Sequence, residues 1–306
     1  MAGIFTRVWR AATLAAASAV ALPGLAAAPQ ITWIVYDFPP GFILSGRYAG
    51  TGTFDLELRY FTAHLPGYSH RIVAGSFARA WYEIAHRDGV CVIGAGRTPA
   101  RTAVAKFSQV AFATTPVGVI LRTDRLERFR PFMDGKGQFD LTKLGQAGEL
   151  RGDFIPGRVY TAAIDALIAS PERQVKLDPV PSMDVATRSV SELHADFVFG
   201  YSHELAFYRV AGRLGPEVSW VPIKGQPRLL FSHIACSAGP LGSSVILKVD
   251  KIIGGAGLPP DYTSLEAQWT SPAELASLYD PTIWERIRRD GFPTADEVLY
   301  EEERQR

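Results

Sequence analysis

The chain has 306 residues, a length that allows one large domain or two modest ones. Its 32 Lys and Arg residues nearly balance its 31 Asp and Glu residues, and 47% of its residues are hydrophobic. A dedicated nucleic-acid surface normally shows as a basic excess, so this balance argues against nucleic acid as a partner. The apolar content is ordinary for a globular protein.

We expect residues 1–27 to be a cleavable secretory signal peptide. Arg7 and Arg10 are followed by an uninterrupted stretch of apolar and small residues at 11–22, and then by alanines at 26–28. This is the order of the basic, apolar and small-residue regions of such a signal. The apolar stretch is shorter than the ~20 residues that a helix needs to cross a bilayer, which disfavours the alternative of an uncleaved anchor. The mature chain is therefore expected to be exported.

Export gives meaning to the two cysteines, Cys91 and Cys236. An oxidising compartment lets a single disulfide persist, and an even count in an exported chain favours pairing. The alternative is two buried free thiols, each packing as a small hydrophobic side chain.

Strands and helices are expected to alternate in the first part of the mature chain. Apolar residues recur at helical spacing from Phe54 to Leu65, and Ser76 is a suitable N-cap for a second helix. Apolar runs bounded by turn residues predict strands at 31–36, 69–73 and 90–93. This alternation indicates an α/β layer with a mostly parallel sheet.

A second α/β unit follows the chain-breaking Pro116. Its predicted strands are 117–121, 153–156 and 196–199, and its predicted helices are 160–169 and 189–193. A strand at 229–236 and a helix from Ser243 come after it. Capping boxes predict C-terminal helices that begin at Ser271 and Thr294.

The two units can be arranged as two lobes. If the second unit is inserted into the first, one lobe comprises 28–115 with 226–306 and the other comprises 116–225. Two such units would suit a ligand cleft between them.

Catalytic and metal-binding motifs are weak in this sequence. None of the six histidines stands in a metal-ligand spacing, so structural or surface roles are expected. The stretch 200–204 begins like a nucleophile elbow but lacks its second glycine, and 94–99 begins like a dinucleotide loop but has Pro99 in place of the third glycine. We therefore expect no catalytic residue, no metal and no cofactor.

The segment 91–108 carries the most specific chemistry. A predicted strand leads to Gly94 and Gly96, which would let a ligand approach backbone N–H groups closely. Pro99 suits the first turn of a helix, whose free N–H groups attract anions, and Arg101 can clamp a carboxylate by charge-assisted hydrogen bonds. The alternative is a capped surface helix with a solvated arginine.

At these residues the sequence resembles the family 3 extracellular solute-binding proteins of ABC transporters. Their motif has a glycine-bearing strand end, then Thr-x-x-Arg, and then Phe-Ser, and the matching residues here are Thr98, Arg101, Phe107 and Ser108. Looser landmarks at 37–40, 150–152, 196 and 234–236 extend the resemblance over nearly the whole mature chain. It implies an α/β, two-lobe fold of the type II periplasmic-binding-protein kind (a Venus flytrap), with the second lobe inserted into the first, crossings near 114–118 and 223–228, and extra C-terminal helices.

The resemblance implies a ligand held between the lobes. The residues expected to contact the ligand are Asp37, Phe38, Gly96, Arg97, Thr98, Arg101, Arg158, Tyr160 and Tyr201. The resemblance also places Cys91 and Cys236 in the same lobe, which favours a disulfide between them.

Two departures separate this sequence from amino-acid-binding members of that family. Gly96 stands where those members usually have a hydroxyl residue, and Tyr201 falls near their Asp that holds the ligand's ammonium group. A tyrosine does not supply that negative charge at neutral pH. A standard α-amino acid is therefore not the expected ligand, and Arg158 and Tyr160 favour an anionic or aromatic one.

The function implied by the resemblance is non-catalytic capture of a small polar, carboxylate-bearing solute in the periplasm for an ABC-type importer. The implied partners are the small-molecule ligand and an ABC permease, or a membrane receptor if the protein serves sensing. We expect a monomer that does not bind nucleic acid. The alternative is a periplasmic enzyme of the dehydratase kind on the same scaffold, with Glu204 and Asp37 as the nearest acid–base candidates.

Overall fold

The computed structural model describes residues 27–227, 229–255, 264, 266–282 and 285. The predicted signal peptide, apart from residue 27, and the predicted helix start at Thr294 lie outside the described residues. In the described part of the chain, no helix combines the length and the apolar character that a membrane crossing requires.

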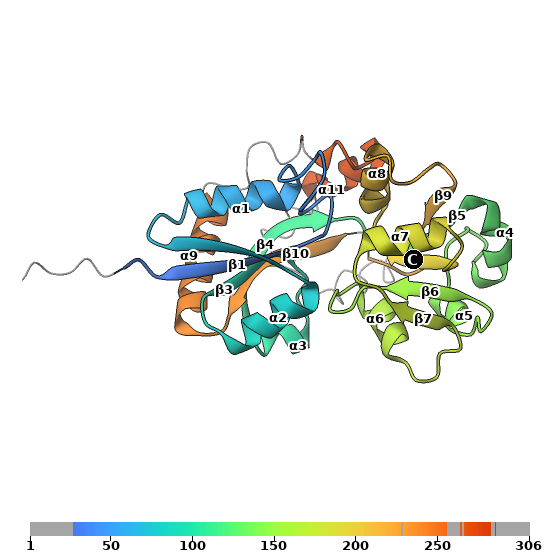
Figure 1. Cartoon of the computed structure of the whole chain (residues 1–306), viewed down its shortest axis with the longest axis horizontal. Helices are drawn as coiled ribbons and strands as arrows, with labels where there is room; N and C mark the ends of the chain where they lie inside the picture. The colour runs from blue at the N-terminus through green and yellow to red at the C-terminus, as the bar shows by residue number, and fades with distance from the viewer. Residues whose placement is uncertain (1–26, 228, 256–263, 265, 283–284, 286–306) are drawn as a thin grey trace, which may run out of the picture.

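Two five-stranded sheets, each flanked by helices, form two lobes (Figure 1). The first sheet contains β1 (Gln30–Tyr36), β2 (Ser69–Gly75), β3 (Val90–Ala95), β4 (Ala105–Thr114) and β10 (Leu230–Ser237). The second contains β5 (Gly118–Arg122), β6 (Arg151–Phe154), β7 (Lys176–Pro179), β8 (Phe197–Gly200) and β9 (Val218–Val221).

Both sheets are mixed. The first has the order β2-β1-β3-β10-β4, in which β1 is parallel to β2 and β3, and β10 runs antiparallel to β3 and β4. The second has the order β7-β6-β8-β5-β9, in which β6 is parallel to β7 and β8, and β5 runs antiparallel to β8 and β9. The chain completes the second sheet before β10 returns to the first, so the second lobe is inserted into the first, as predicted.

The helices are divided between the lobes. Those of the first lobe are α1 (Thr53–Ala63), α2 (Phe77–His86), α3 (Pro99–Thr102) and α9 (Pro240–Gly255). Those of the second are α4 (Leu126–Phe129), α5 (Leu141–Gly145), α6 (Ala162–Ala169), α7 (Met183–Ser191) and α8 (Ser202–Val210), with short 3-10 turns η1 (Thr123–Arg125) and η2 (Arg130–Phe132). A further helix, α11 (Pro272–Leu278), begins at the predicted cap Ser271.

The first lobe shows how the apolar pattern builds its core. Strand β1 is buried on both faces, because α1 covers one side of the sheet and α2 the other (Figure 1). Phe54, Leu58 and Phe61 of α1 lie on the side of the helix that packs on the sheet, at the spacing that the sequence predicted. Ser76 caps α2 by accepting a hydrogen bond from the N–H of Arg79 at 3.2 Å.

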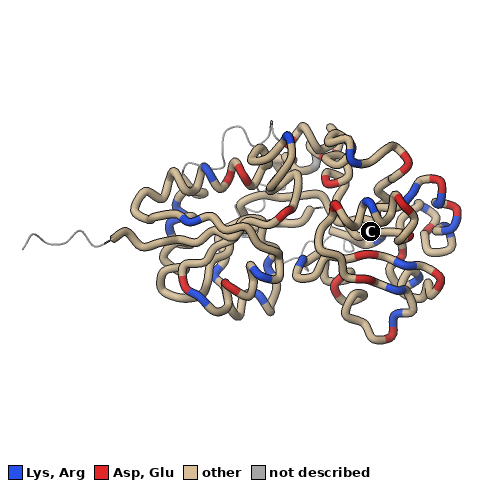
Figure 2. Tube along the Cα trace, in the orientation of Figure 1, with Lys and Arg blue, Asp and Glu red and all other residues tan. Residues whose placement is uncertain are grey.

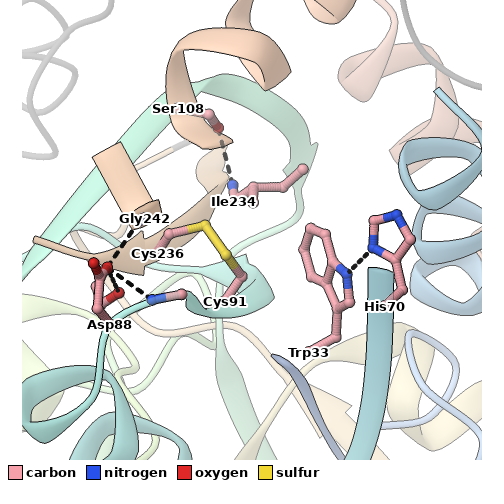
Figure 3. The surroundings of a disulfide bond; sticks show 10 residues. Trp33, His70, Asp88, Cys91, Ser108, Ile234, Cys236 and Gly242 are labelled. Carbon is pink, nitrogen blue, oxygen red and sulfur yellow. Dashed lines mark hydrogen bonds between the residues drawn. A yellow bond between two sulfur atoms is a disulfide. The ribbon is translucent and has the colours of Figure 1, made fainter. Parts of the chain in front are cut away.

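Cys91 and Cys236 form a disulfide that joins β3 to β10 (Figure 3). They are direct partners in the antiparallel register, and both are fully buried. Beside them, Asp88 accepts hydrogen bonds from the N–H groups of Leu241 and Gly242 at the start of α9, each at 2.9 Å. A carboxylate in this place satisfies N–H groups that a helix start leaves without helical partners. The predicted disulfide is confirmed, and it ties the returning strand to the first half of its lobe.

Some predicted boundaries were wrong, mostly in the second lobe. The strand predicted at 153–156 is Arg151–Phe154, and the helix predicted at 189–193 is Met183–Ser191. Strands β4, β7 and β9 and helices α4, α5 and α8 were not predicted. These elements are short or rich in small and polar residues, so they are stabilised by packing rather than by a strong local pattern.

Lys and Arg residues and Asp and Glu residues are both distributed along the chain in the two lobes (Figure 2). Exposed ion pairs gather on the second lobe, including Arg122–Asp124, Arg130–Glu127 and Arg151–Asp178. Such pairs contribute only about 0–1 kcal/mol each to stability. The surface therefore fits the near-zero net charge.

Glu57 of α1 is a fully buried carboxyl whose oxygens have no hydrogen-bond partner among the described residues. Burial, with a smaller contribution from the charge of Glu266, raises the pKa of Glu57 from 4.5 to about 8. Between these two values the folded protein keeps a proton that the unfolded chain releases. The contribution of Glu57 to folding stability is therefore lost progressively as the pH rises from 4.5 to 8.

Replacing Glu57 with Gln is expected to raise the free energy of unfolding at pH 8 by about 1–2 kcal/mol and to change it little at pH 4. The amide keeps the shape of the side chain but cannot ionise. Urea unfolding at both pH values measures the difference, with the exposed Glu172→Gln as the matched control. The same change in stability at pH 4 and pH 8 would contradict this account.

Candidate functional site

A cavity of about 570 Å³ lies between the two lobes. The first lobe contributes the ends of β1 and β3, the start of α3 and parts of β4 and β10. The second contributes residues 158–161, the first turn of α6 and the start of α8. The volume lies within the range of about 300–1,000 Å³ that is usual for small-molecule sites, which often occur between domains.

Arg101 joins the two lobes at this cavity. It donates from Nη1 to the Gly96 carbonyl in its own lobe at 3.0 Å and from Nη2 to the Gly157 carbonyl in the other lobe at 2.9 Å. The guanidinium also stacks on Trp81 of α2, with 3.9 Å between Cζ and the ring centroid. Burial lowers the pKa of Arg101 to about 10, so the side chain remains charged at neutral pH.

The backbone that carries Arg101 is held by Thr98. The Thr98 hydroxyl accepts a hydrogen bond from the N–H of Arg101 at 3.3 Å and so caps α3, with Pro99 in the first turn. The predicted short helix with Pro99 in its first turn is therefore confirmed. However, a four-residue helix has a weak dipole, so the charge of Arg101 matters more here than the helix start.

The lobes also touch through backbone and apolar side chains. Gly157 has φ +79°, and a Cβ there would lie 2.7 Å from the backbone N of Ala78 on α2. Only glycine allows this approach. In addition, Ile43 from the loop after β1 packs into the core of the second lobe, and the Tyr48 ring lies 6.1 Å from that of Phe207.

Arg158, which lines the cavity, forms a buried ion pair with Glu204 behind it. Two parallel hydrogen bonds join Nη1 to Oε1 at 2.9 Å and Nη2 to Oε2 at 2.8 Å, and the two side chains are 3% and 0% exposed. Glu204 Oε2 also accepts from the backbone N–H of Tyr201 at 2.9 Å, which caps the start of α8. Burial by itself would lower the pKa of Arg158, but the charge and hydrogen bonds of Glu204 raise it overall.

The predicted contact residues mostly meet at this cavity. Its lining includes every one of them except Asp37, namely Phe38, Gly96, Arg97, Thr98, Arg101, Arg158, Tyr160 and Tyr201. Asp37 instead lies near Asp184 and Arg213 of the second lobe. The direct role of each lining residue toward a ligand stays a prediction.

Phe107 and Ser108 of the sequence motif support the cavity from behind. The Ser108 hydroxyl accepts a hydrogen bond from the N–H of Ile234 at 3.0 Å, which joins β4 to β10 (Figure 3). The Phe107 ring lies 6.2 Å from that of Trp81, the residue under Arg101. Phe107 and Ser108 therefore help to hold in place the part of the cavity wall to which Trp81 belongs.

Among the lining residues that sequence reasoning missed, Trp81, Asp165 and His203 carry the most chemistry. Trp81 looks like an ordinary core residue at helical spacing, and nothing in the pattern distinguishes the two roles. Asp165 stands in the first turn of α6, where it accepts a hydrogen bond from the N–H of Tyr160 at 3.2 Å. His203 stacks on Tyr201 with 4.9 Å between ring centroids, and burial lowers its pKa to about 4, so it is neutral at pH 7.

No three His, Cys, Asp or Glu side chains converge as metal ligands anywhere in the described residues. The arrangement is instead suited to holding an organic solute. Its lining combines three arginines (Arg97, Arg101 and Arg158), several aromatic side chains and the first turn of α6 with Ala162 and Ala163.

Comparison with known proteins identifies the fold. No family model and no curated protein matches the chain, whereas many solved structures do. A periplasmic binding protein of Salmonella typhimurium with high arginine specificity aligns at a TM-score of 0.59 and 13% identity, over 80% of this chain and 100% of that one. A mutant of the T. maritima protein ArgBP aligns at 0.58 and 16% identity, over 79% and 95%.

A third match has a link to an enzyme. It is an ancestral amino-acid-binding protein, described as a precursor of cyclohexadienyl dehydratase, with a TM-score of 0.56 and 15% identity over 79% of this chain and 95% of that one. At such identities the likeness establishes the fold alone. The chain has the α/β two-lobe fold of periplasmic binding proteins, as the sequence predicted.

Proposed function

We propose that this chain is a non-catalytic periplasmic solute-binding protein that captures a small carboxylate-bearing solute between its lobes and presents it to an ABC-type permease. The observation that carries the proposal is Arg101, a charged guanidinium that reaches across the cavity from one lobe to the other. The fold shared with arginine-binding periplasmic proteins and the predicted signal peptide at 1–27 support it. The lobe boundaries at 115/116 and 225/226 belong to the same proposal.

Arg101 suits the carboxylate because its charge is not neutralised by an acid. Both hydrogen bonds that the guanidinium of Arg101 makes with the described residues go to backbone carbonyls. Asp165 lies near the guanidinium but is not hydrogen-bonded to it. A ligand carboxylate can therefore add charge-assisted hydrogen bonds to the remaining N–H groups. Such a ligand favours the conformation in which the lobes meet, because it contacts both of them.

A panel of organic acids, amino acids and polyamines is expected to contain at least one carboxylate that raises the melting temperature of the mature chain. Replacing Arg101 with Ala should weaken its binding at least about tenfold, and Arg101→Lys should weaken it less, because Lys keeps the charge but loses the planar fork. Calorimetry measures the affinities, with the exposed Arg130→Ala as the control. If no compound of the panel shifts the melting temperature, the proposed function is wrong. If Arg101→Ala binds as the wild type does, Arg101 is not the carboxylate site.

The second candidate is an enzyme on the same scaffold, and Glu266 is the observation that favours it. Glu266 lines the cavity, and burial raises its pKa to about 7, a value suited to proton transfer near neutral pH. Glu204 is bound to Arg158 and Asp37 lies outside the cavity lining, so neither keeps the acid–base role that the sequence suggested. If the protein turns over a prephenate-like compound and the Glu266→Gln variant does not, the chain is an enzyme and the proposed binding function is wrong.

A further inference from the structure

Glu204 of α8, which is paired with the lining residue Arg158, already has several hydrogen-bond partners within the protein. Glu204 receives two hydrogen bonds from Arg158 and one from the N–H of Tyr201, all between 2.8 and 2.9 Å, and it is fully buried. The two oxygens are thus oriented toward groups of the protein itself. A positively charged ligand group would have to displace Arg158 to reach them.

The aromatic faces at the same place are also occupied. Cζ of Arg158 lies 4.8 Å from the ring centroid of Phe38, 5.1 Å from that of Tyr160 and 5.0 Å from that of Tyr201. Three rings around one cation are an arrangement that could recognise an ammonium ligand. Here the protein's own guanidinium fills it.

The charges that remain at the cavity favour an anion. Arg158–Glu204 is the one ion pair that involves the lining within the described part of the chain, so Arg97 and Arg101 face the cavity without a salt bridge. The lining carboxyls are Asp165 and Glu266, and burial raises the pKa of both. Of these two carboxyls, Asp165 is the better candidate to bind a ligand's ammonium group. It lies near Arg101, where a ligand carboxylate would bind, and one of its oxygens has no hydrogen bond to the described residues.

The walls favour an aromatic or apolar body. The lining contains many aromatic side chains from both lobes, including Tyr36, Phe38, Phe77, Trp81, Tyr160 and Tyr201. Flat aromatic walls stack on flat ligands and exclude water from a charged end group.

We infer that Arg158 and Glu204 occupy the place where a ligand's ammonium group would bind, so that the site selects aromatic or apolar carboxylates that carry no positive charge. This inference rests on the proposed function, since it names the class of solute that the same cavity takes. The ammonium group of an amino acid would lose its water without reaching the carboxylate of Glu204, which disfavours its binding. A carboxylate of the same shape without that group avoids the loss.

Three compounds of one skeleton test the selectivity: 3-phenylpropionate, L-phenylalanine and 2-phenylethylamine. They carry the carboxylate alone, the carboxylate with the ammonium group, and the ammonium group alone. Calorimetry is expected to show 3-phenylpropionate binding at least about tenfold more tightly than L-phenylalanine, with no measurable binding of 2-phenylethylamine. Equal or tighter binding of L-phenylalanine overturns the inference while the proposed function stands. If none of the three binds but a carboxylate with a polar body or an ammonium group does, the inference is also wrong; if nothing binds, both fail.

Variants of the ion pair test its role directly. In Arg158→Met, Glu204 is left as a carboxylate without its cation, and the preference for 3-phenylpropionate over L-phenylalanine is expected to shrink or reverse. The double variant Arg158→Met with Glu204→Gln carries no charge at this place and replaces the single variant if that one does not fold. It should still bind 3-phenylpropionate, with a smaller preference over L-phenylalanine than the wild type has. Asp165→Asn is the rival test, because it should leave the preference unchanged. A preference that depends on Asp165 and not on Arg158 overturns the inference.

Discussion

Arg158→Met is expected to lower the free energy of unfolding by about 3–5 kcal/mol, because it leaves the carboxylate of Glu204 buried without its cation. The pair is among the most deeply buried charges in the described chain, with side-chain exposures of 3% and 0%. Glu204→Gln should also destabilise, since it leaves Arg158 charged and unpaired. The double variant is expected to be closer to the wild type than either single variant, because removing both charges removes the unpaired one.

Urea unfolding of the wild type, the two single variants and the double variant gives the coupling energy of the pair. The matched control is Arg151→Met, whose partner Asp178 is on the surface and whose loss should cost no more than about 1 kcal/mol. If Arg158→Met and Arg151→Met lower the free energy of unfolding by similar amounts, the buried pair contributes no more to stability than an exposed one. This measurement needs no ligand, so it stands apart from the tests of function.

Removing the disulfide, as Cys91→Ala with Cys236→Ala, is expected to lower the free energy of unfolding by about 2–5 kcal/mol. The bond closes a loop of 145 residues that contains the whole second lobe. Without it the unfolded chain gains conformational entropy, which lowers the free energy of unfolding. Because both cysteines are fully buried, a reducing agent should act on the wild type only when the chain unfolds.

Urea unfolding with and without dithiothreitol measures the contribution of the disulfide. The midpoint of the wild type is expected to fall in the reducing agent, whereas that of the double Ala variant is expected to stay where it is. The variant with no reducing agent controls for the loss of side-chain volume. A wild-type midpoint that does not respond to reduction during unfolding would show that the bond contributes little.

Much of the first lobe followed from the sequence alone. The apolar runs at 31–36 and 90–93, the helical spacing from Phe54 and the cap at Ser76 are local patterns, and local patterns determine local structure. The same is true of the short helix that carries Pro99 and Arg101. The expected export and the even count favoured a disulfide between Cys91 and Cys236, and the family resemblance strengthened that prediction by placing both in one lobe.

Only the tertiary structure decided what these residues contact. Arg158 looked like a residue for an anionic ligand, but residues 46 positions apart meet in the fold and Glu204 takes its guanidinium. Trp81 looked like core and lies under Arg101. Sequence by itself indicated the strands at 31–36 and 90–93, the caps at Ser76 and Ser271 and the short helix that carries Arg101, whereas β4, β7 and β9 were not predicted. The partners of each charge depended on long-range packing, since burial makes an ion pair between distant segments more favourable than leaving either charge alone.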